Sequence, residues 1–237
     1  MWERLFGREF RRKRALAKAE AQVQSNPQAA VMRDFLAVPF PDKKTFCADA
    51  SIVSLDLETT GLDPKKDEIL SIGLVEIHGP AIKLSTAWHE IIRLDRELPA
   101  ESVVIHQITD DQKDQGKPLE EVLPQLLERL RGKPMLVHFK RIEQNFLDAA
   151  CRKLYGAPFV IPIIDTLELG QRVFERRNHT VQPNDLRLFN LRPRYNLPQY
   201  KAHNALNDAL ATAELFLAMA AEMGPSDRCK LYDFVTD

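Results

Sequence analysis

Two acidic side chains stand at the end of an apolar run in the first third of the chain. The run spans residues 51–57 and is rich in Ile, Val and Leu, and Asp56 and Glu58 lie at its end. Because the side chains of a strand alternate between its faces, these two carboxylates point the same way. Neighbouring carboxylates that lose hydration repel each other, and a divalent cation commonly offsets that cost. The pair therefore predicts a cation site, the alternative being two solvated acids on an edge strand.

A histidine and an aspartate five residues apart form a second group near the end of the chain. On one regular helix this spacing would put the two side chains about 140° apart. If both serve one site, His203 must lie in the loop before a helix and Asp208 in its early turns. Asn204 is a suitable N-cap, and the apolar periodicity begins at Leu206. The alternative is a first-turn Asp208 that complements the helix dipole beside a surface histidine.

The elements that would position these groups alternate along the chain. Apolar runs at residues 51–57, 68–77 and 81–92, with a Gly-Pro turn at 79–80, predict an antiparallel meander. Further strands are expected at 135–137 and 159–164, helices at 119–130, 142–155, 166–175 and 206–221, and a loop at 182–199. Hairpin strands followed by alternating helices and strands indicate a mixed α/β sheet with helices on its faces.

Composition and charge are those of a globular protein. The 237 residues are 44% apolar and 28% charged, and the net charge of -1 neither supports nor excludes nucleic-acid binding. The cysteines Cys47, Cys151 and Cys229 lie far apart, which argues against a disulfide framework or a structural zinc site and favours a reducing, cytoplasmic location. No apolar run approaches the ~18 residues of a membrane span, so no membrane contact is expected.

The first 47 residues differ from the rest. Six basic side chains fall in an Ala-rich stretch with good helix propensity up to about Gln24: Arg8, Arg11, Arg12, Lys13, Arg14 and Lys18. The sequence Ser-Asn-Pro at 25–27 ends that pattern. We therefore expect a basic helical extension and linker at 1–47, a main domain at 48–224 and a C-terminal tail at 225–237. The basic helix is either a solvated face packed on the domain or a contact for phosphates or a partner.

The pair Asp56 and Glu58 and the pair His203 and Asp208 resemble the first and third motifs of the DnaQ-like (DEDDh) 3′→5′ exonucleases. This is the family of the epsilon proofreading subunit of bacterial DNA polymerase III. The matching segments are Asp56-Leu-Glu58-Thr59-Thr60-Gly61-Leu62, and His203 followed by Asp208-Ala. Residues 101–109 resemble the family's "IHGIT" segment, and residues 164–167 resemble its "DTL" strand end. The step from His203 to Asp208 is that of the histidine subclass. The resemblance covers about residues 51–220 and implies a ribonuclease H-like mixed five-stranded sheet with helices on both faces.

One motif departs from the pattern of the family. The second motif resembles "AHNAxFD", whereas this chain has His138-Phe139-Lys-Arg-Ile-Glu143 at the corresponding place. Aligning the histidine and the following Phe-Leu puts Glu143 where the family has its metal-binding aspartate. Glutamate keeps the charge and adds a methylene, so it still reaches a cation directly or through a water. Asp148 is a weaker substitute, because five residues farther along a helix it faces elsewhere.

The resemblance implies a two-metal hydrolysis of the terminal phosphodiester. Two divalent cations, Mg²⁺ or Mn²⁺, would lie about 3.5–4 Å apart. Their expected ligands are the carboxylates of Asp56, Glu58, Glu143 and Asp208. His203 would take the proton from the attacking water, since an imidazole exchanges protons readily near neutral pH. The products would be nucleoside 5′-monophosphates.

Three further residues are expected to contact the substrate. The resemblance implies that the backbone around Thr59 contacts the terminal nucleotide and that Leu62 packs near its base. His106 is expected to hold a sugar or a phosphate. His138 is either a neighbour of the catalytic groups or a buried structural histidine.

The expected partner is a nucleic acid with a free 3′ end, with single-stranded DNA as the first choice. An exonuclease of the same fold that acts on RNA is the alternative, because nothing in the motifs reads the 2′-hydroxyl. A third hypothesis is a non-catalytic module that binds nucleic acid or a polymerase, and the complete first and third motifs argue against it. The basic N-terminal helix is the expected contact for a polymerase or another protein. The loop at 182–199, which carries Arg187, Arg192 and Arg194, would either line the substrate path or be solvated.

Overall fold

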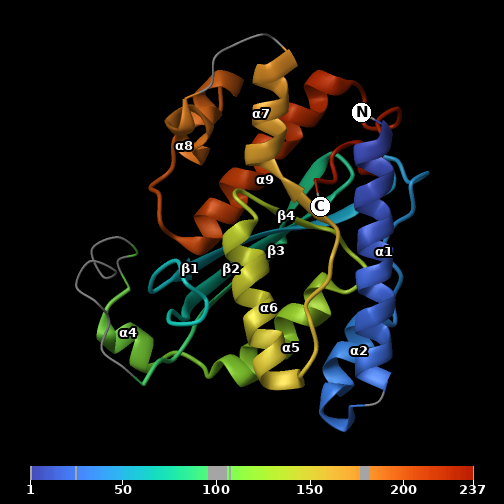
Figure 1. Ribbon diagram of the computed structural model, residues 1–237. Helices are drawn as coiled ribbons and strands as arrows, with labels where there is room; N and C mark the ends of the chain where they lie inside the picture. Colours follow the sequence, from blue (N-terminus) through green and yellow to red (C-terminus); the bar gives the residue numbers. More distant parts are fainter. Residues whose placement is uncertain (1, 25, 96–105, 107, 177–181, 237) are drawn as a thin grey trace.

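A five-stranded mixed sheet forms the centre of the protein, as the computed structural model shows (Figure 1). The structure describes residues 2–24, 26–95, 106, 108–176 and 182–236. The strands follow the order β3-β2-β1-β4-β5 across the sheet. β1 pairs antiparallel with β2 and parallel with β4. The bounds are β1 Ser51–Thr59, β2 Ile69–His78, β3 Ala81–Ile91, β4 Met135–Val137 and β5 Ile163–Asp165. β1 is therefore the central strand, and its two acids are not on an edge.

Helices cover both faces of the sheet, with α7, α8 and α9 on one side and α2, α5 and α6 on the other (Figure 1). Alternation along β1 divides its side chains between the two layers. Val53 and Leu55 pack with the α5 and α6 side, whereas Ile52 packs with the α9 side. The helix bounds are α1 Trp2–Gln24, α2 Ala30–Leu36, α4 Asp110–Asp114, α5 Leu119–Leu130, α6 Arg141–Tyr155, α7 Thr166–Arg176, α8 Leu188–Leu191 and α9 Ala205–Met223. The predicted fold class is confirmed.

Helix α9 lies unusually close to the sheet. A Cβ atom on Gly73 of β2 would stand 2.1 Å from the backbone nitrogen of Leu206, so only glycine fits there. On the neighbouring strand the hydroxyl of Ser54 donates to the carbonyl of Ala209 at 2.7 Å, and both groups are buried. Gly73 pairs with Asp56 in the strand register. The close approach therefore brings the start of α9 next to the acidic end of β1.

Two expectations about local structure are wrong. The segment 182–199, expected as a loop, contains the 3-10 turns η3 Pro183–Leu186 and η4 Arg192–Tyr195 on either side of α8. Leu186, Leu188 and Leu191 bury their side chains against the α7 and α9 layer, which explains the order in this segment. The strand expected at 159–164 is confined to β5, because Pro162 has no N–H to pair with a neighbour.

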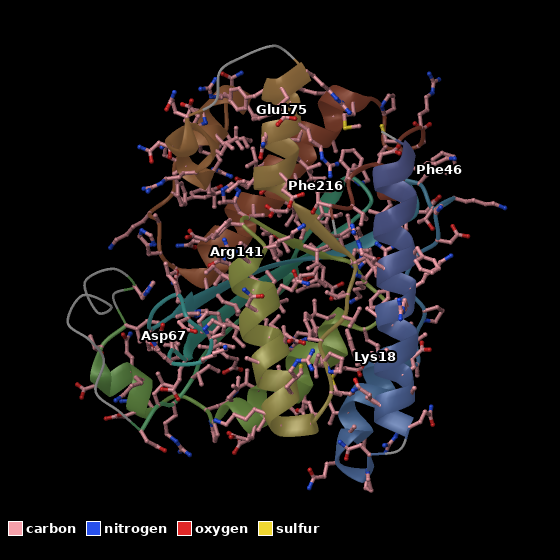
Figure 2. The ribbon with its side chains drawn as sticks, viewed as in Figure 1. Lys18, Phe46, Asp67, Arg141, Glu175 and Phe216 are labelled. Carbon is pink, nitrogen blue, oxygen red and sulfur yellow. The ribbon has the colours of Figure 1, made fainter. Side chains whose placement is uncertain are left out.

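The terminal segments pack on the same two layers. Met32 and Phe35 of α2 are buried in the cluster that includes α5 and α6. Near the C-terminus, the ring of Phe234 meets that of Phe216 of α9 edge-on, with 5.3 Å between centroids, in the upper layer of Figure 2. Thr236 N–H donates to the carbonyl of Ile163 at 2.8 Å beside β5. Among the described residues, no helix combines the length and apolar character needed to cross a membrane.

Candidate active site

The C-terminal half of β1 carries two carboxylates on the face that α9 covers. Glu58 is buried and Asp56 is half-buried. Their pairing partners on β2 are Gly73 and Ser71, whose small size leaves the space above the strand free for α9. As predicted from strand alternation, Asp56 and Glu58 lie together on one face of the sheet.

Helix α9 adds a third carboxylate to this pair. The helix begins where the Asn204 side chain accepts a hydrogen bond from the N–H of Asn207 at 3.1 Å, as the sequence predicts. Asp208 then lies in the first turn and is buried. One carboxylate oxygen from each of Asp56, Glu58 and Asp208 lies within 4.8 Å of the other two. Three acids from two distant parts of the chain therefore share one small space.

Two histidines border the acidic cluster. His203 is exposed, has a left-handed backbone (φ 66°), and donates its N–H to Asp208 Oδ2 at 3.0 Å. Its ring lies 6.1 Å from that of His106, centroid to centroid, and nitrogens of both rings lie within 4.8 Å of a Glu58 oxygen. His106 Nδ1 directly contacts the Glu58 carboxylate. His106 was expected to bind a sugar or a phosphate, and its contact with Glu58 could not be read from the sequence.

Glu143 approaches the cluster from the opposite helix layer. It occupies the first turn of α6 and is 3% exposed. It is not part of the group within 4.8 Å, but its charge raises the pKa of Asp56. Asp148 points elsewhere, because it binds the Arg152 side chain at 2.7 Å and the N–H of Phe159 at 3.0 Å. The geometry therefore favours Glu143 over Asp148 as the fourth acid.

The electrostatics of the site favour a bound cation. Burial raises the pKa of Asp56 well above its ordinary value, and the charges of Glu143, Glu58 and Asp208 raise it further. Burial likewise raises the pKa of Glu143, and it raises the pKa of Asp208 to about 7. One buried oxygen on each of Glu58, Glu143 and Asp208 has no hydrogen-bond partner among the described residues. Clustered, unpartnered carboxylate oxygens are the donor set that Mg²⁺ and Mn²⁺ prefer.

A buried aspartate of the segment that resembles the "DTL" strand end, for which the sequence suggested no role, holds the start of α6. Asp165, at the end of β5, accepts hydrogen bonds from the N–H groups of Phe139, Lys140 and Leu167 at 2.9, 3.0 and 3.0 Å. Phe139 has a left-handed backbone (φ 77°) that these bonds support. In the sequence, Asp165 was indicated only by its position at the end of an apolar run, where the chain resembles the "DTL" strand end. Asp165 thereby fixes the turn that leads to Glu143.

His138 lies in a buried, structural setting beside this turn. Its Nδ1 atom is 2.8 Å from the hydroxyl oxygen of Thr166, and this hydroxyl donates to the carbonyl of Val137 at 3.2 Å. Burial lowers the pKa of His138 to about 4. The side chain is therefore neutral near neutral pH, and these contacts agree with the structural alternative.

The loop after β1 presents the residues expected to meet the substrate. The hydroxyl of Thr59 donates to the carbonyl of Gly61 at 2.6 Å, and that of Thr60 donates to Asp67 Oδ1 at 3.3 Å. Gly61 has no room for a side chain, since a Cβ would stand 2.4 Å from the Asp67 carboxylate. Leu62 is 79% exposed. Figure 2 shows Asp67 in this loop, beyond the end of the strands.

One arginine expected near the substrate path lies elsewhere. Arg192 is fully buried and donates to backbone carbonyls of the chain itself. It therefore cannot line a path for nucleic acid. Of the "IHGIT"-like stretch, residues 101–105 and 107 lie outside the described residues.

Comparison with known proteins agrees with this geometry. Residues 53–216 match the family model described as exonuclease (RNase_T). The PolC-type DNA polymerase III of Thermotoga maritima is 34% identical over 182 residues, which are 77% of this chain and 13% of that polymerase. The corresponding polymerase of Streptococcus sanguinis is 26% identical over 204 residues, 85% of this chain and again 13% of the relative. This chain thus spans only a small part of these relatives.

Solved structures show the same fold. The nuclease domain of 3'hExo, a DEDDh family member bound to rAMP, superposes with a TM-score of 0.64 at 17% identity, covering 79% of this chain and 98% of that one. The zinc-bound E. coli ExoI–ssDNA complex gives a TM-score of 0.64 at 15% identity, covering 73% and 41%. The family match extends over most of the chain and includes Asp56, Glu58 and His203 with Asp208. The chain therefore belongs to the exonuclease family, in agreement with the resemblance of its sequence to the DnaQ-like exonucleases.

Proposed function

We propose that this protein removes nucleotides one at a time from the 3′ end of single-stranded DNA and releases nucleoside 5′-monophosphates. The observation that carries this proposal is the cluster of Asp56, Glu58 and Asp208, each of which brings one oxygen within 4.8 Å of the others, beside His203. The family supplies the reaction class, and DnaQ-like exonucleases depend on divalent metal ions. The unpartnered carboxylate oxygens fit that requirement.

Each residue of the cluster has a distinct role in the proposal. Two divalent cations, Mg²⁺ or Mn²⁺, would be held by Asp56, Glu58, Glu143 and Asp208. When bound, the cations would make a coordinated water more acidic and neutralise charge on the phosphate. His203 accepts the proton of the attacking water. Its exposure and its place within 4.8 Å of Glu58 allow both contact with water and proximity to the acids.

Three other residues hold the substrate. The backbone at Thr59 contacts the terminal nucleotide, and the exposed Leu62 packs against its base. His106 lies against Glu58, so we assign it to the sugar or phosphate next to the cluster. This contact also lets His106 orient the Glu58 carboxylate.

DNA is the proposed substrate because the more similar relatives are named DNA polymerases. The structural neighbours point both ways, since one is bound to rAMP and another to single-stranded DNA. RNA-directed hydrolysis is thus the second candidate. The names of the relatives also support a polymerase as protein partner, and the exposed basic side chains Arg11, Arg14 and Lys18 of α1 are the proposed contact.

The test is hydrolysis of 5′-labelled and 3′-labelled single-stranded DNA and RNA with Mn²⁺, Mg²⁺ or EDTA. We expect a stepwise ladder from the 5′-labelled strand and release of labelled mononucleotide from the 3′-labelled strand, both abolished by EDTA. His203→Ala and Glu143→Ala should each lose at least ~100-fold in rate. His78→Ala is the matched control, because His78 lies on another part of β2, where it contacts Glu76 at 2.8 Å. Metal-independent cleavage, or none with any substrate, would contradict the proposal.

A further inference from the structure

One buried arginine fixes the segment that leads to His203. Arg192 opens η4 and is fully buried. Its Nε and Nη2 atoms donate to the carbonyl of Pro198 at 3.2 and 2.7 Å. Its Nη1 atom donates to the carbonyl of Ala211 on α9 at 2.5 Å. A single guanidinium therefore joins the incoming chain to the helix that carries Asp208.

Tyr200 and Glu214 complete this contact. The hydroxyl of Tyr200 donates to Glu214 Oε1 at 2.7 Å, and Arg192 Nη2 donates to Glu214 Oε2 at the same distance. The guanidinium carbon lies 4.8 Å from the centroid of the Tyr200 ring. Glu214 lies on α9, so Tyr200 is held against that helix only three residues before His203. We call Arg192, Tyr200 and Glu214 the arginine anchor.

The other end of the short segment is fixed independently. The N–H of His203 donates to Asp208 Oδ2 at 3.0 Å, and Asn204 caps α9. Only Lys201 and Ala202 separate this attachment from Tyr200. The left-handed backbone of His203 is an unfavourable conformation that needs support on both sides.

We propose that the arginine anchor positions the imidazole of His203 for catalysis. This inference rests on the proposed role of His203 as the general base. Arginine suits the position because its planar group offers several donors in fixed directions, which a lysine ammonium does not. A buried charge is costly unless its donors are used, and an apolar side chain would serve packing alone at lower cost. The charge of Arg192 also reaches Asp208 directly. Tyr200 instead contacts Glu214 and Arg192, so we assign its effect on the site to the segment that leads to His203.

The experiment compares single and double variants in steady-state hydrolysis of a 5′-labelled oligonucleotide at saturating Mn²⁺. Tyr200→Phe removes one hydroxyl and keeps the ring. We expect its kcat to fall about tenfold or more, because small displacements of a catalytic group are costly, while KM changes by less than about twofold. Glu214→Gln should act in the same direction. In a His203→Ala background, Tyr200→Phe should cause no further loss.

The matched control is Tyr155→Phe. The hydroxyl of Tyr155 is shielded from solvent and has no hydrogen-bond partner among the described residues, so kcat should stay at the wild-type value. A wild-type kcat for Tyr200→Phe would overturn the positioning role, and so would a loss that multiplies with that of His203→Ala. A wild-type rate for His203→Ala alone would instead overturn the general-base role itself. The two failures are therefore distinguishable.

Discussion

At the scale of single residues, Glu143 tests how far the acidic cluster tolerates a longer side chain. Glu143→Gln keeps the volume and removes the charge, so we expect the Mn²⁺ concentration for half-maximal activity to rise at least ~10-fold. Glu143→Asp should keep measurable activity, because the carboxylate remains on the same turn of α6. Titration of the hydrolysis rate with Mn²⁺ measures both effects. Glu128→Gln is the control, since Glu128 is an exposed partner of Arg131 on α5.

The raised pKa values of the buried acids make the stability of the metal-free protein depend on pH. The pKa of Asp208 rises from 3.8 to about 7 in the folded state, so the folded protein holds this proton more tightly than the unfolded chain does. The resulting stabilisation is complete below about pH 4 and is lost as pH rises through about 7. Asp56 and Glu143 shift in the same direction.

In EDTA, the free energy of unfolding by urea should therefore be larger at about pH 5 than at about pH 8. Saturating Mn²⁺ should reverse that order, because cations bind the ionised carboxylates. Asp208→Asn should flatten the dependence in EDTA. An equal free energy at both pH values for the metal-free wild type would contradict the electrostatic account of the cluster.

At the scale of elements, the contact between β2 and α9 sets the depth at which Asp208 lies. Gly73→Ala would place a methyl group 2.1 Å from the backbone of Leu206, which cannot yield as a side chain would. We expect α9 to shift outward, with a loss of roughly 1–3 kcal/mol in stability and a lower hydrolysis rate. Thermal unfolding and the oligonucleotide assay measure the two effects. Gly7→Ala is the matched control, because nothing lies within 4 Å of a Cβ at that position of α1.

The elements that the sequence predicts well are those in which apolar residues recur with a regular period. The alternation around Asp56 and Glu58 and the cap at Asn204 depend on neighbours in the chain, and both are found in the structure. The short turns between residues 182 and 199 have no period to detect. The burial of Arg192 depends on a carbonyl of α9 19 residues away, and the contact between His106 and Glu58 joins separate segments. Patterns of neighbouring residues do not reveal contacts between residues that are far apart in the sequence.

At the scale of the whole molecule, segments outside the family match complete the core. The predicted boundaries at 47 and 224 remain a proposal for how the catalytic unit is delimited. Phe234 is fully buried against Phe216, so Phe234→Ala should lower the free energy of unfolding by about 3–5 kcal/mol. Phe10→Ala is the control, because Phe10 is 68% exposed on α1 and its loss should change stability by less than about 0.5 kcal/mol. Urea unfolding with equal Mn²⁺ compares them. An equal free energy of unfolding for the two variants would mean that the C-terminal segment does not contribute to the stability of the core.

The left-handed backbone of His203 has a consequence for how the enzyme would respond to selection. Glycine adopts φ 66° without strain, so His203→Gly should gain up to roughly 1 kcal/mol in stability while losing its base. Neutralising a buried acid such as Asp208 should also stabilise the metal-free protein. A screen for heat resistance alone would then enrich inactive variants, because substitutions at His203 and Asp208 that stabilise the protein also remove its activity. Any attempt to make this enzyme more thermostable must therefore select for turnover at the same time.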